Sequence, residues 1–229
     1  KTELKGLILL KNKKTELKGL ILLKNKTKEN SNLGNASESE PIISKKFQLS
    51  KKIRAAQILL LNFKTYEEVD KEFGKLKNNG INTVIFRVFH NKGDRYYGFT
   101  ASKEETGVYF QSKYAPVVEN ILPKIAELSH KHGLQLFAWM TTRYADYGIE
   151  NKKEYLCKSF DFEAKDYKLC KGMSLFNKEV IKRLENIYLE LAANDIDGIL
   201  FQDDLVLKNN EEFSEAAKEA YFKEFQTEL

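Results

Sequence analysis

Short apolar runs alternate with helical patterns from residue 53 to the end of the chain, and this alternation restricts the fold more than any other feature. The apolar runs lie at residues 57–62, 83–89, 134–140 and 197–203. Continuous apolar runs of this length are typical of parallel strands that are covered on both faces. The patterns that follow them predict four helices, at residues 66–79, 117–132, 177–194 and 211–225. Strand–helix alternation means a parallel sheet with right-handed crossovers, so the sequence predicts an α/β fold.

The number of βα units indicates a particular α/β architecture. A full (β/α)8 barrel repeats the unit eight times and takes about 250 residues. Residues 53–229 are therefore predicted to form a partial (β/α)8 TIM-type barrel, its first four βα units, so that the chain ends within the barrel. An open α/β sheet is the structural alternative. Half a barrel leaves strand edges unpaired, which would allow self-association through these open edges.

The first 52 residues differ from the rest of the chain. Residues 1–26 contain the 13-residue segment KTELKGLILLKNK twice, without a change. Residues 27–52 are interpreted as a low-complexity linker, because residues 27–45 are rich in Ser, Asn, Glu and Gly and have too few apolar side chains to offset their ordering entropy. We expect a flexible N-terminal segment. The apolar part of each repeat is too short and too interrupted for a signal peptide.

The net charge of +5 comes from the repeat. Each copy holds four Lys and one Glu, so the pair contributes +6 and the remainder of the chain −1. A nucleic-acid-binding face needs basic residues concentrated on the folded part, so nucleic acid is not an expected partner. No apolar run approaches the roughly 18 residues of a membrane span, and none is predicted.

The cysteines and histidines do not indicate a metal site. Cys157 and Cys170 would either close a disulfide, if the chain is exported, or remain two free thiols. Neither belongs to a CxxC pair. His130 and His132 are two apart on a predicted helix, so their side chains do not share a face. We expect no metal and no other cofactor.

Functional side chains of βα folds gather where strands end and loops leave. The sharpest feature at such an end is Asp203-Asp204, two acids directly after an apolar strand, which are costly to bury without a partner or a task. A loop or capping role for one of them stays open beside catalysis. Because successive strand residues point to opposite faces, the two are not expected to act as one carboxylate pair. If Gly198, Leu200 and Gln202 face the barrel axis, Asp204 shares that side, and Asp203 reaches the site only if the strand has ended by then.

Further polar and aromatic side chains follow the predicted strands. The polar candidates are Arg87, His90, Trp139, Arg143, Tyr144 and Gln202. Two long loops, which begin after residues 89 and 142, carry rings that suit stacking on sugars, namely Tyr96, Tyr97, Phe99, Tyr109, Phe110, Tyr114, Tyr144 and Tyr147. Long loops in compact domains are usually functional or disordered. For each ring, covering the barrel mouth is an equal alternative.

Four segments, in this order, resemble the C-terminal glycoside-hydrolase domain of bacterial poly-β-1,6-N-acetylglucosamine deacetylases and related glycosyl hydrolases. They are Val84-Ile85-Phe86-Arg87-Val88-Phe89, Val108-Tyr109-Phe110, Leu136-Phe137-Ala138-Trp139-Met140, and Asp197-Gly198-Ile199-Leu200-Phe201-Gln202-Asp203-Asp204. The last segment is the most specific. The resemblance covers roughly residues 55–225.

The resemblance implies an endo-acting glycosidase of the cell envelope, periplasmic or extracellular, that cleaves or binds partially deacetylated β-1,6-linked N-acetylglucosamine polysaccharide. It also implies that one of Asp203 and Asp204 is the catalytic acid. From their places at the strand ends, the residues expected to bind sugar are Arg87, His90, Trp139, Arg143, Tyr144 and Gln202. The usual second acid would come from a later strand of the barrel; otherwise the 2-acetamido group of the substrate would act as the nucleophile. Deacetylation is not predicted, because no metal-dependent deacetylase domain is present.

Two departures from the family pattern leave alternatives open. Gln202 stands where the family commonly has His, and Thr141 stands where the family has Pro after Trp139-Met140. A non-catalytic carbohydrate-binding module on a degenerate barrel is therefore a second interpretation. A barrel glycosidase for another polysaccharide is a third, because the fold does not fix the substrate.

Overall fold

The structure is a computed structural model that describes residues 52–102 and 104–229. The tandem repeat at 1–26 and nearly all of the predicted linker at 27–52 lie outside the described residues. The expectations about these two segments therefore stay predictions.

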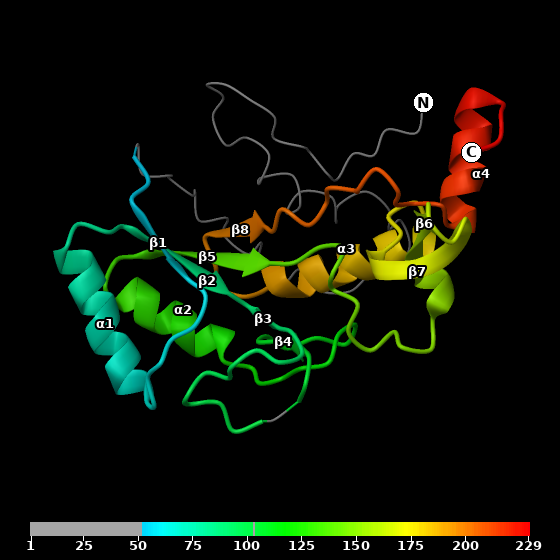
Figure 1. Cartoon of the computed structure of the whole chain (residues 1–229). Helices are drawn as coiled ribbons and strands as arrows, with labels where there is room; N and C mark the ends of the chain where they lie inside the picture. Colours follow the sequence, from blue (N-terminus) through cyan, green and yellow to red (C-terminus); the bar gives the residue numbers. More distant parts are fainter. Residues whose placement is uncertain (1–51, 103) are drawn as a thin grey trace, which may run out of the picture. The chain divides into compact units, whose positions relative to one another are not determined.

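A parallel sheet of four strands forms the centre of the described part (Figure 1). Its strands are β1 (Ala55–Ile58), β2 (Thr83–Arg87), β5 (Gln135–Met140) and β8 (Gly198–Phe201), and each pairs in parallel with the next. Their order in the sheet follows their order in the chain. A doubly wound sheet reverses its strand order at a switch point, whereas a barrel does not. The predicted α/β fold is confirmed, and this strand order is that of the first half of a β/α barrel.

The strand register separates a buried face of the sheet from a more open one. Phe86, Ala138 and Ile199 are neighbours across three strands, and all are buried. The next residues along β5 and β8, Trp139 and Leu200, point to the other face and are half-buried. The buried face is the one that the helices cover, and burying a side chain as large as that of Phe86 contributes about 2 kcal/mol.

Three helices connect the strands of this sheet. They are α1 (Tyr66–Asn78), α2 (Leu122–Lys131) and α3 (Lys178–Ala192), and Figure 1 shows α1 and α2 side by side. Thr65 caps α1 as predicted, because its hydroxyl oxygen accepts a hydrogen bond from the backbone N–H of Glu68 at 3.3 Å. Asn177 caps α3 in the same way, with the N–H of Glu179 at 2.9 Å. Local sequence thus sets the start of both helices.

The predicted helix at 117–132 is shorter in the structure, where α2 begins at Leu122. Residues 117–121 are not helical, and Val117 forms a parallel bridge with Val108. Pro123 lies in the first turn of α2, where a missing N–H costs nothing. The loop before this helix also holds a short antiparallel pair, β3 (Phe89–His90) and β4 (Gly107–Val108).

The segment at 143–173, expected to be a loop, contains a β-hairpin. After a short 3-10 helix, η2 (Lys153–Tyr155), strands β6 (Leu156–Asp161) and β7 (Asp166–Met173) pair antiparallel. A disulfide joins Cys157 to Cys170, whose Cα atoms are 5.5 Å apart. Of the two states that the sequence left open for these cysteines, the structure has the disulfide, which stabilises the fold by about 3 kcal/mol for a ring of this size.

The last helix, α4 (Glu215–Phe225), begins four residues later than predicted and stands beside the hairpin (Figure 1). The carboxylate of Glu215 pairs with Lys158 of β6 at 3.0 Å, and the ammonium of Lys218 lies 4.9 Å from the ring centre of Tyr167. Ala217 is the only fully buried residue of α4. A helix with so small an apolar face gains little from packing on a sheet. For this reason α4 does not cover the central sheet as α1, α2 and α3 do.

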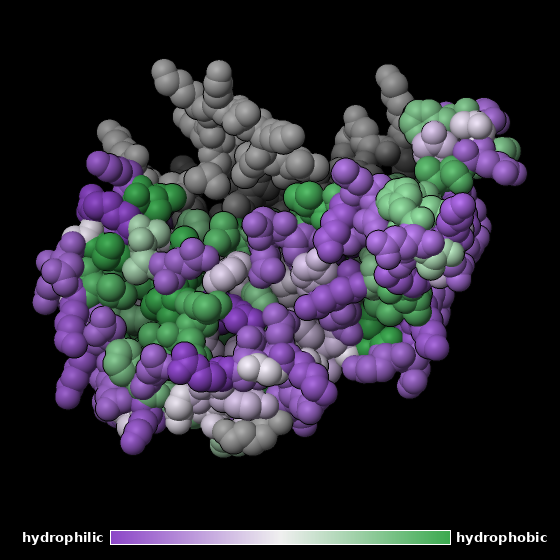
Figure 2. All heavy atoms as spheres, viewed as in Figure 1, coloured by the Kyte–Doolittle hydropathy of each residue, from purple (hydrophilic) through white to green (hydrophobic). Residues whose placement is uncertain are grey.

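Polar and apolar surfaces are segregated on the face shown in Figure 2. Hydrophobic side chains gather over the α1–β2 part and over the hairpin, with hydrophilic side chains between them.

None of the described helices is long and apolar enough to cross a membrane.

Candidate active site

The carboxylate of Asp204, just after β8, is buried and holds the beginning of the loop that leaves β5. It accepts hydrogen bonds from the hydroxyl of Thr141 at 2.6 Å, from the backbone N–H of Thr142 at 2.9 Å and from the N–H of Tyr144 at 3.1 Å. The Thr142 hydroxyl also donates to it. Hydrogen bonds to a charged group contribute about 1.5–3 kcal/mol each. Both carboxylate oxygens are therefore engaged, and Asp204 anchors the loop.

Asp203 has a different environment. Its side chain is exposed, and no described residue forms a hydrogen bond or an ion pair with its carboxylate. The two acids thus have separate environments, although β8 ends at Phe201 and the pair stands in the turn that follows, so their hydrogen bonds and not strand alternation set them apart. Of the pair, Asp203 is the acid that can meet a ligand.

Arg87, at the end of β2, is buried and forms an ion pair with Asp94. Its guanidinium carbon lies 4.2 Å from the ring centre of Phe89, and its Nε atom has no hydrogen-bond partner. Asp94 also accepts a hydrogen bond from the backbone N–H of Asn91 at 2.8 Å. The pair is fixed in place, and the Nε–H group of Arg87 is buried without a partner.

His90 lies close to Arg87 and is also buried. Its Nδ1 atom is 2.8 Å from the hydroxyl oxygen of Tyr109, and its ring stacks on Tyr96 with 4.3 Å between ring centres. Burial lowers the pKa of His90, and the nearby Arg87 adds to this effect, whereas Asp94 opposes it. A neutral imidazole can either donate or accept a hydrogen bond through its other nitrogen.

A small cleft opens among these groups, with an empty volume of about 170 Å³. It is lined by Leu59, Leu60, Arg87, Phe89, His90, Asp94, Arg95, Tyr97 and Tyr109. Most of this volume is open to solvent, and the enclosed part of the cleft has room for about one water molecule.

Three other predicted binding residues lie at the ends of β5 and β8. Trp139 pairs in register with Arg87 on one side and Leu200 on the other, and its half-buried ring meets Phe89 edge-on at 6.0 Å. Tyr144 and Gln202 are half-buried. The strand-end residues are thus brought to one edge of the sheet, as the fold requires.

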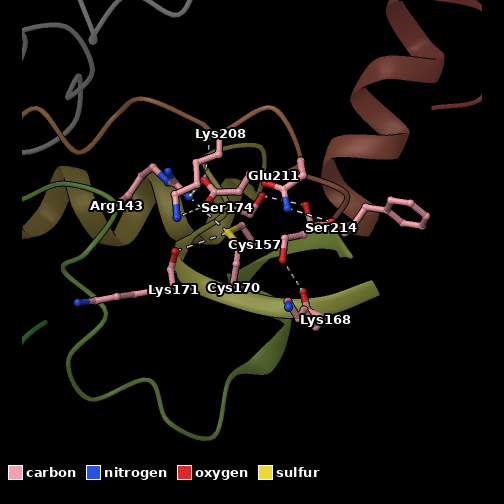
Figure 3. The surroundings of a disulfide bond; sticks show 12 residues. Arg143, Cys157, Lys168, Cys170, Lys171, Ser174, Lys208, Glu211 and Ser214 are labelled. Atoms are coloured by element: carbon pink, nitrogen blue, oxygen red, sulfur yellow. Dashed lines mark hydrogen bonds and ion pairs between the residues drawn. A yellow bond between two sulfur atoms is a disulfide. The ribbon is translucent and has the colours of Figure 1, made fainter. Parts of the chain in front are cut away.

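Arg143 is buried completely. Its guanidinium donates to the backbone oxygen of Val206 at 2.9 Å and to the carboxylate of Glu211 at 3.1 Å, and it lies 3.3 Å from the sulfur of Cys157 (Figure 3). It therefore ties the loop after β5 to the disulfide and to the segment before α4. Its guanidinium is thus buried against protein partners, whereas the sequence predicted that it would bind sugar.

The structure brings forward two residues that the sequence did not single out, Asp146 and Arg183. Arg183 of α3 donates from Nη1 to the backbone oxygen of Ala145 at 2.6 Å and from Nη2 to that of Tyr147 at 2.7 Å. Asp146 lies between these two carbonyls, and burial raises its pKa. In the sequence, the only sign of a role for Asp146 is its position among the aromatic residues of a loop. No local pattern indicates that its side chain would be partly buried.

The described residues contain no group of three or more His, Cys, Asp or Glu side chains that could hold a metal ion. His130 and His132 instead pair with separate acids, at 2.8 Å from Asp197 and 2.7 Å from Asp70. Their imidazoles connect helix α2 to neighbouring elements and stand apart from the strand-end residues.

Polar and aromatic side chains gathered at the strand ends of a parallel βα sheet occupy the place where β/α-barrel proteins carry their functional residues. Residues 64–228 match the sequence profile of hypothetical glycosyl hydrolase family 13. The match covers more than half of the chain, and the chain belongs to this family. No curated protein sequence matches the chain.

Solved structures with a similar course of the chain are glycoside-processing enzymes with low identity. The noncanonic maltogenic alpha-amylase AmyB from Thermotoga neapolitana is 14% identical, with a TM-score of 0.45, over 76% of this chain and 43% of that one. Alpha-L-fucosidase isoenzyme 2 from Paenibacillus thiaminolyticus is 14% identical, with a TM-score of 0.48, over 76% and 26%. The chain thus spans less than half the length of these proteins, and at such TM-scores nothing about activity follows from the likeness.

Proposed function

We propose that this chain carries the catalytic site of a glycoside hydrolase and that Asp203 is the acid of the Asp203-Asp204 pair that meets the substrate. One observation supports this division: Asp203 is exposed and unpaired among the described residues, whereas Asp204 is buried with both oxygens engaged. Asp204 then positions the loop, and Asp203 takes part in the reaction. Family membership supports the reaction class.

The proposed substrate is partially deacetylated β-1,6-linked N-acetylglucosamine polysaccharide, which would be cleaved at linkages in the interior of the polymer. This choice rests on the resemblance of the segment that ends in Asp203-Asp204. Arg87 and His90 would bind one sugar in the cleft at the end of β2, and Trp139, Tyr144 and Gln202 would contact its neighbours. The open edges of β1 and β8 would permit pairing with a second copy of the chain.

We also propose that the protein works at the cell envelope, in the periplasm or outside the cell. The Cys157–Cys170 disulfide supports this location, because disulfides persist in oxidising compartments and are rare where thiols are kept reduced. Exopolysaccharide processing takes place in the same compartments.

The direct test is the release of soluble oligosaccharides from the purified polymer by the purified protein. We expect Asp203→Asn to lower the rate by about 10²–10⁴, the usual size of an acid–base contribution. Glu219→Gln, which changes an exposed acid on α4, is the matched control and should keep the wild-type rate. If the Asp203→Asn variant released products at the wild-type rate, the assignment of Asp203 to the reaction would be contradicted.

The second candidate is a non-catalytic carbohydrate-binding module, favoured by Gln202 in the position where the family commonly has His. It predicts that the wild-type protein binds the polymer without releasing products. Isothermal titration with the same polymer, run beside the product assay, separates the two functions.

A further inference from the structure

We infer that the Cys157–Cys170 disulfide is a thiol–disulfide exchange site, at which an external thiolate attacks Cys170 and Cys157 leaves as a thiolate held by Arg143. This site is separate from the proposed hydrolysis, and its function does not depend on turnover of a sugar. The inference comes from the different surroundings of the two sulfur atoms. One of them can be reached from solvent, and the other lies beside a buried cation.

Access to the disulfide is one-sided. Cys157 is fully buried, because its strand β6 pairs with β7 on one side and contacts residues 210–213 on the other. Cys170 of β7 is half-buried, and its chain neighbours Leu169 and Lys171 are exposed. The rate and course of thiol exchange depend on access and on which sulfur is attacked. An incoming thiolate therefore reaches the sulfur of Cys170 and not that of Cys157.

Arg143 favours Cys157 as the leaving group. Its Nη2 atom lies 3.3 Å from the sulfur of Cys157, and the guanidinium is completely buried (Figure 3). Its Nε–H group is buried without a partner, so the guanidinium has a hydrogen-bond donor left for an anion. A neighbouring Arg stabilises a thiolate, and a stabilised thiolate leaves faster. The carboxylate of Glu211, 3.1 Å from Nη2, offsets part of this charge.

The other charged side chains labelled around the disulfide are lysines (Figure 3). Lys168 forms an ion pair within the hairpin, and the ammonium of Lys208 lies 3.9 Å from the carboxylate of Glu211. Lys171 directly follows Cys170 and is exposed. An exposed cation raises the local concentration of anions. Lys171 therefore assists the approach of a thiolate to the sulfur that is attacked.

The proposed step is balanced in atoms and electrons. The sulfur of the external thiolate forms a bond to the sulfur of Cys170 as the Cys157–Cys170 bond breaks. The electron pair of the broken bond stays on Cys157, so one thiolate is consumed and one is formed. The external thiol is oxidised to a mixed disulfide on Cys170, and Cys157 is reduced. In the reverse step the Cys157 thiolate attacks Cys170, expels the external thiolate and restores the disulfide.

The strand that carries Cys170 also supports the loop after β5. The backbone N–H of Met173 donates to the carbonyl oxygen of Arg143 at 2.8 Å. The ring of Tyr144 lies so close to Gly172 that a side chain added there would come within 2.9 Å of it. The ammonium of Lys171 lies 5.2 Å from the centre of the same ring. Opening the disulfide therefore loosens the end of β7 on which this loop rests.

The first experiment identifies the attacked sulfur in the folded protein. The protein is incubated without denaturant in excess reduced glutathione, quenched with acid and mapped as peptides by mass spectrometry. We expect the glutathione adduct on Cys170 and a free thiol at Cys157, with the circular dichroism spectrum of the folded protein retained. An adduct on Cys157, or reaction only at denaturant concentrations that unfold the protein, would overturn the inference.

The second experiment compares the rate of this reaction in two variants that disturb the same buried ion pair. Arg143→Met should slow it about tenfold, because the leaving thiolate loses its cation. Glu211→Gln should accelerate it a few fold, because the charge of Arg143 is no longer offset. Lys153→Met, which removes an exposed cation from η2, is the control and should react like wild type. Faster reaction in both variants would mean that opening of the hairpin sets the rate, and this would overturn the inference.

Glu211→Gln keeps this test valid if Arg143→Met does not fold. Its reaction should be faster at an unchanged urea midpoint, whereas an unchanged rate would contradict the role of the guanidinium. The coupling to the loop has its own readout in Trp139, the single tryptophan of the chain, at the end of β5. Its fluorescence emission should shift when Cys170 carries glutathione and return when the disulfide closes again. Emission that stays the same would refute the coupling.

Discussion

The end of β2 and the ends of β5 and β8 both present charged side chains at the same edge of the sheet, but they use charge differently. At the end of β2, side chains pair with one another, as Arg87 does with Asp94, and they leave a small cleft. At the ends of β5 and β8, charged side chains hold backbone, as Asp204 and Arg183 do, and leave acids available. Under the proposed function, the first region would bind a sugar, and the second would position groups that react with it.

The largest effect that tests this contrast is expected for Asp204→Ala. The change leaves the N–H groups of Thr142 and Tyr144 and two hydroxyl groups without their acceptor, at about 1–3 kcal/mol for each group that stays buried. We expect a loss of about 4 kcal/mol of unfolding free energy and no hydrolysis. Urea unfolding followed by circular dichroism measures the first, and product release the second. Near-native stability would show that Asp204 does not anchor the loop.

A smaller loss of stability but a clear loss of binding is expected for Arg87→Met. Breaking a buried ion pair costs about 3–5 kcal/mol, and the partial exposure of Asp94 reduces this to about 2 kcal/mol. Polymer binding should weaken about tenfold, because the cleft loses its buried cation. Titration calorimetry with oligosaccharides is the measurement. Arg95→Met, which removes an exposed cation from the same cleft, is the comparison and should cost little stability.

Tyr109→Phe should have a moderate effect confined to the β2 region. It removes the hydroxyl that lies 2.8 Å from Nδ1 of His90 and leaves the packing unchanged. We expect a loss of about 1 kcal/mol in stability and an increase in KM of a few fold, with kcat retained. A fall in kcat at unchanged KM would place His90 among the reacting groups and would blur the distinction between the two regions.

The smallest effect is predicted outside both regions, on the hairpin. The hydrogen bond from Lys168, followed by those from the backbone N–H groups of Ala164 and Glu163, lowers the pKa of Asp161 to about 2. A lowered folded pKa stabilises the fold above the unfolded value, and this contribution disappears as pH falls from about 4 to about 2. Carboxyl chemical shifts measured by NMR should show this titration. Lys168→Met should move the pKa of Asp161 upward without a change in hydrolysis.

The sequence by itself determined the elements and the edge at which function lies. The apolar runs and helical patterns gave the parallel sheet, and the side chains of Thr65 and Asn177 set the starts of two helices, because caps act on backbone only a few residues away. Strand ends of a parallel sheet share one edge, so the position of Asp203-Asp204 after a strand located that edge. Strand alternation predicted that the two acids would diverge, but the hydrogen bonds of Asp204 in the turn after β8 are what set them apart.

Only the tertiary structure decided which groups are free and which are engaged. The donors to Asp204 come from residues about 60 positions earlier, and Arg183 reaches carbonyls 36 and 38 positions earlier. The burial of Arg143, the choice of a disulfide for Cys157 and Cys170, and the docking of α4 on the hairpin depend on the same kind of distant contact. Local propensity carries no information on such contacts, because they depend on the paths of long loops through space.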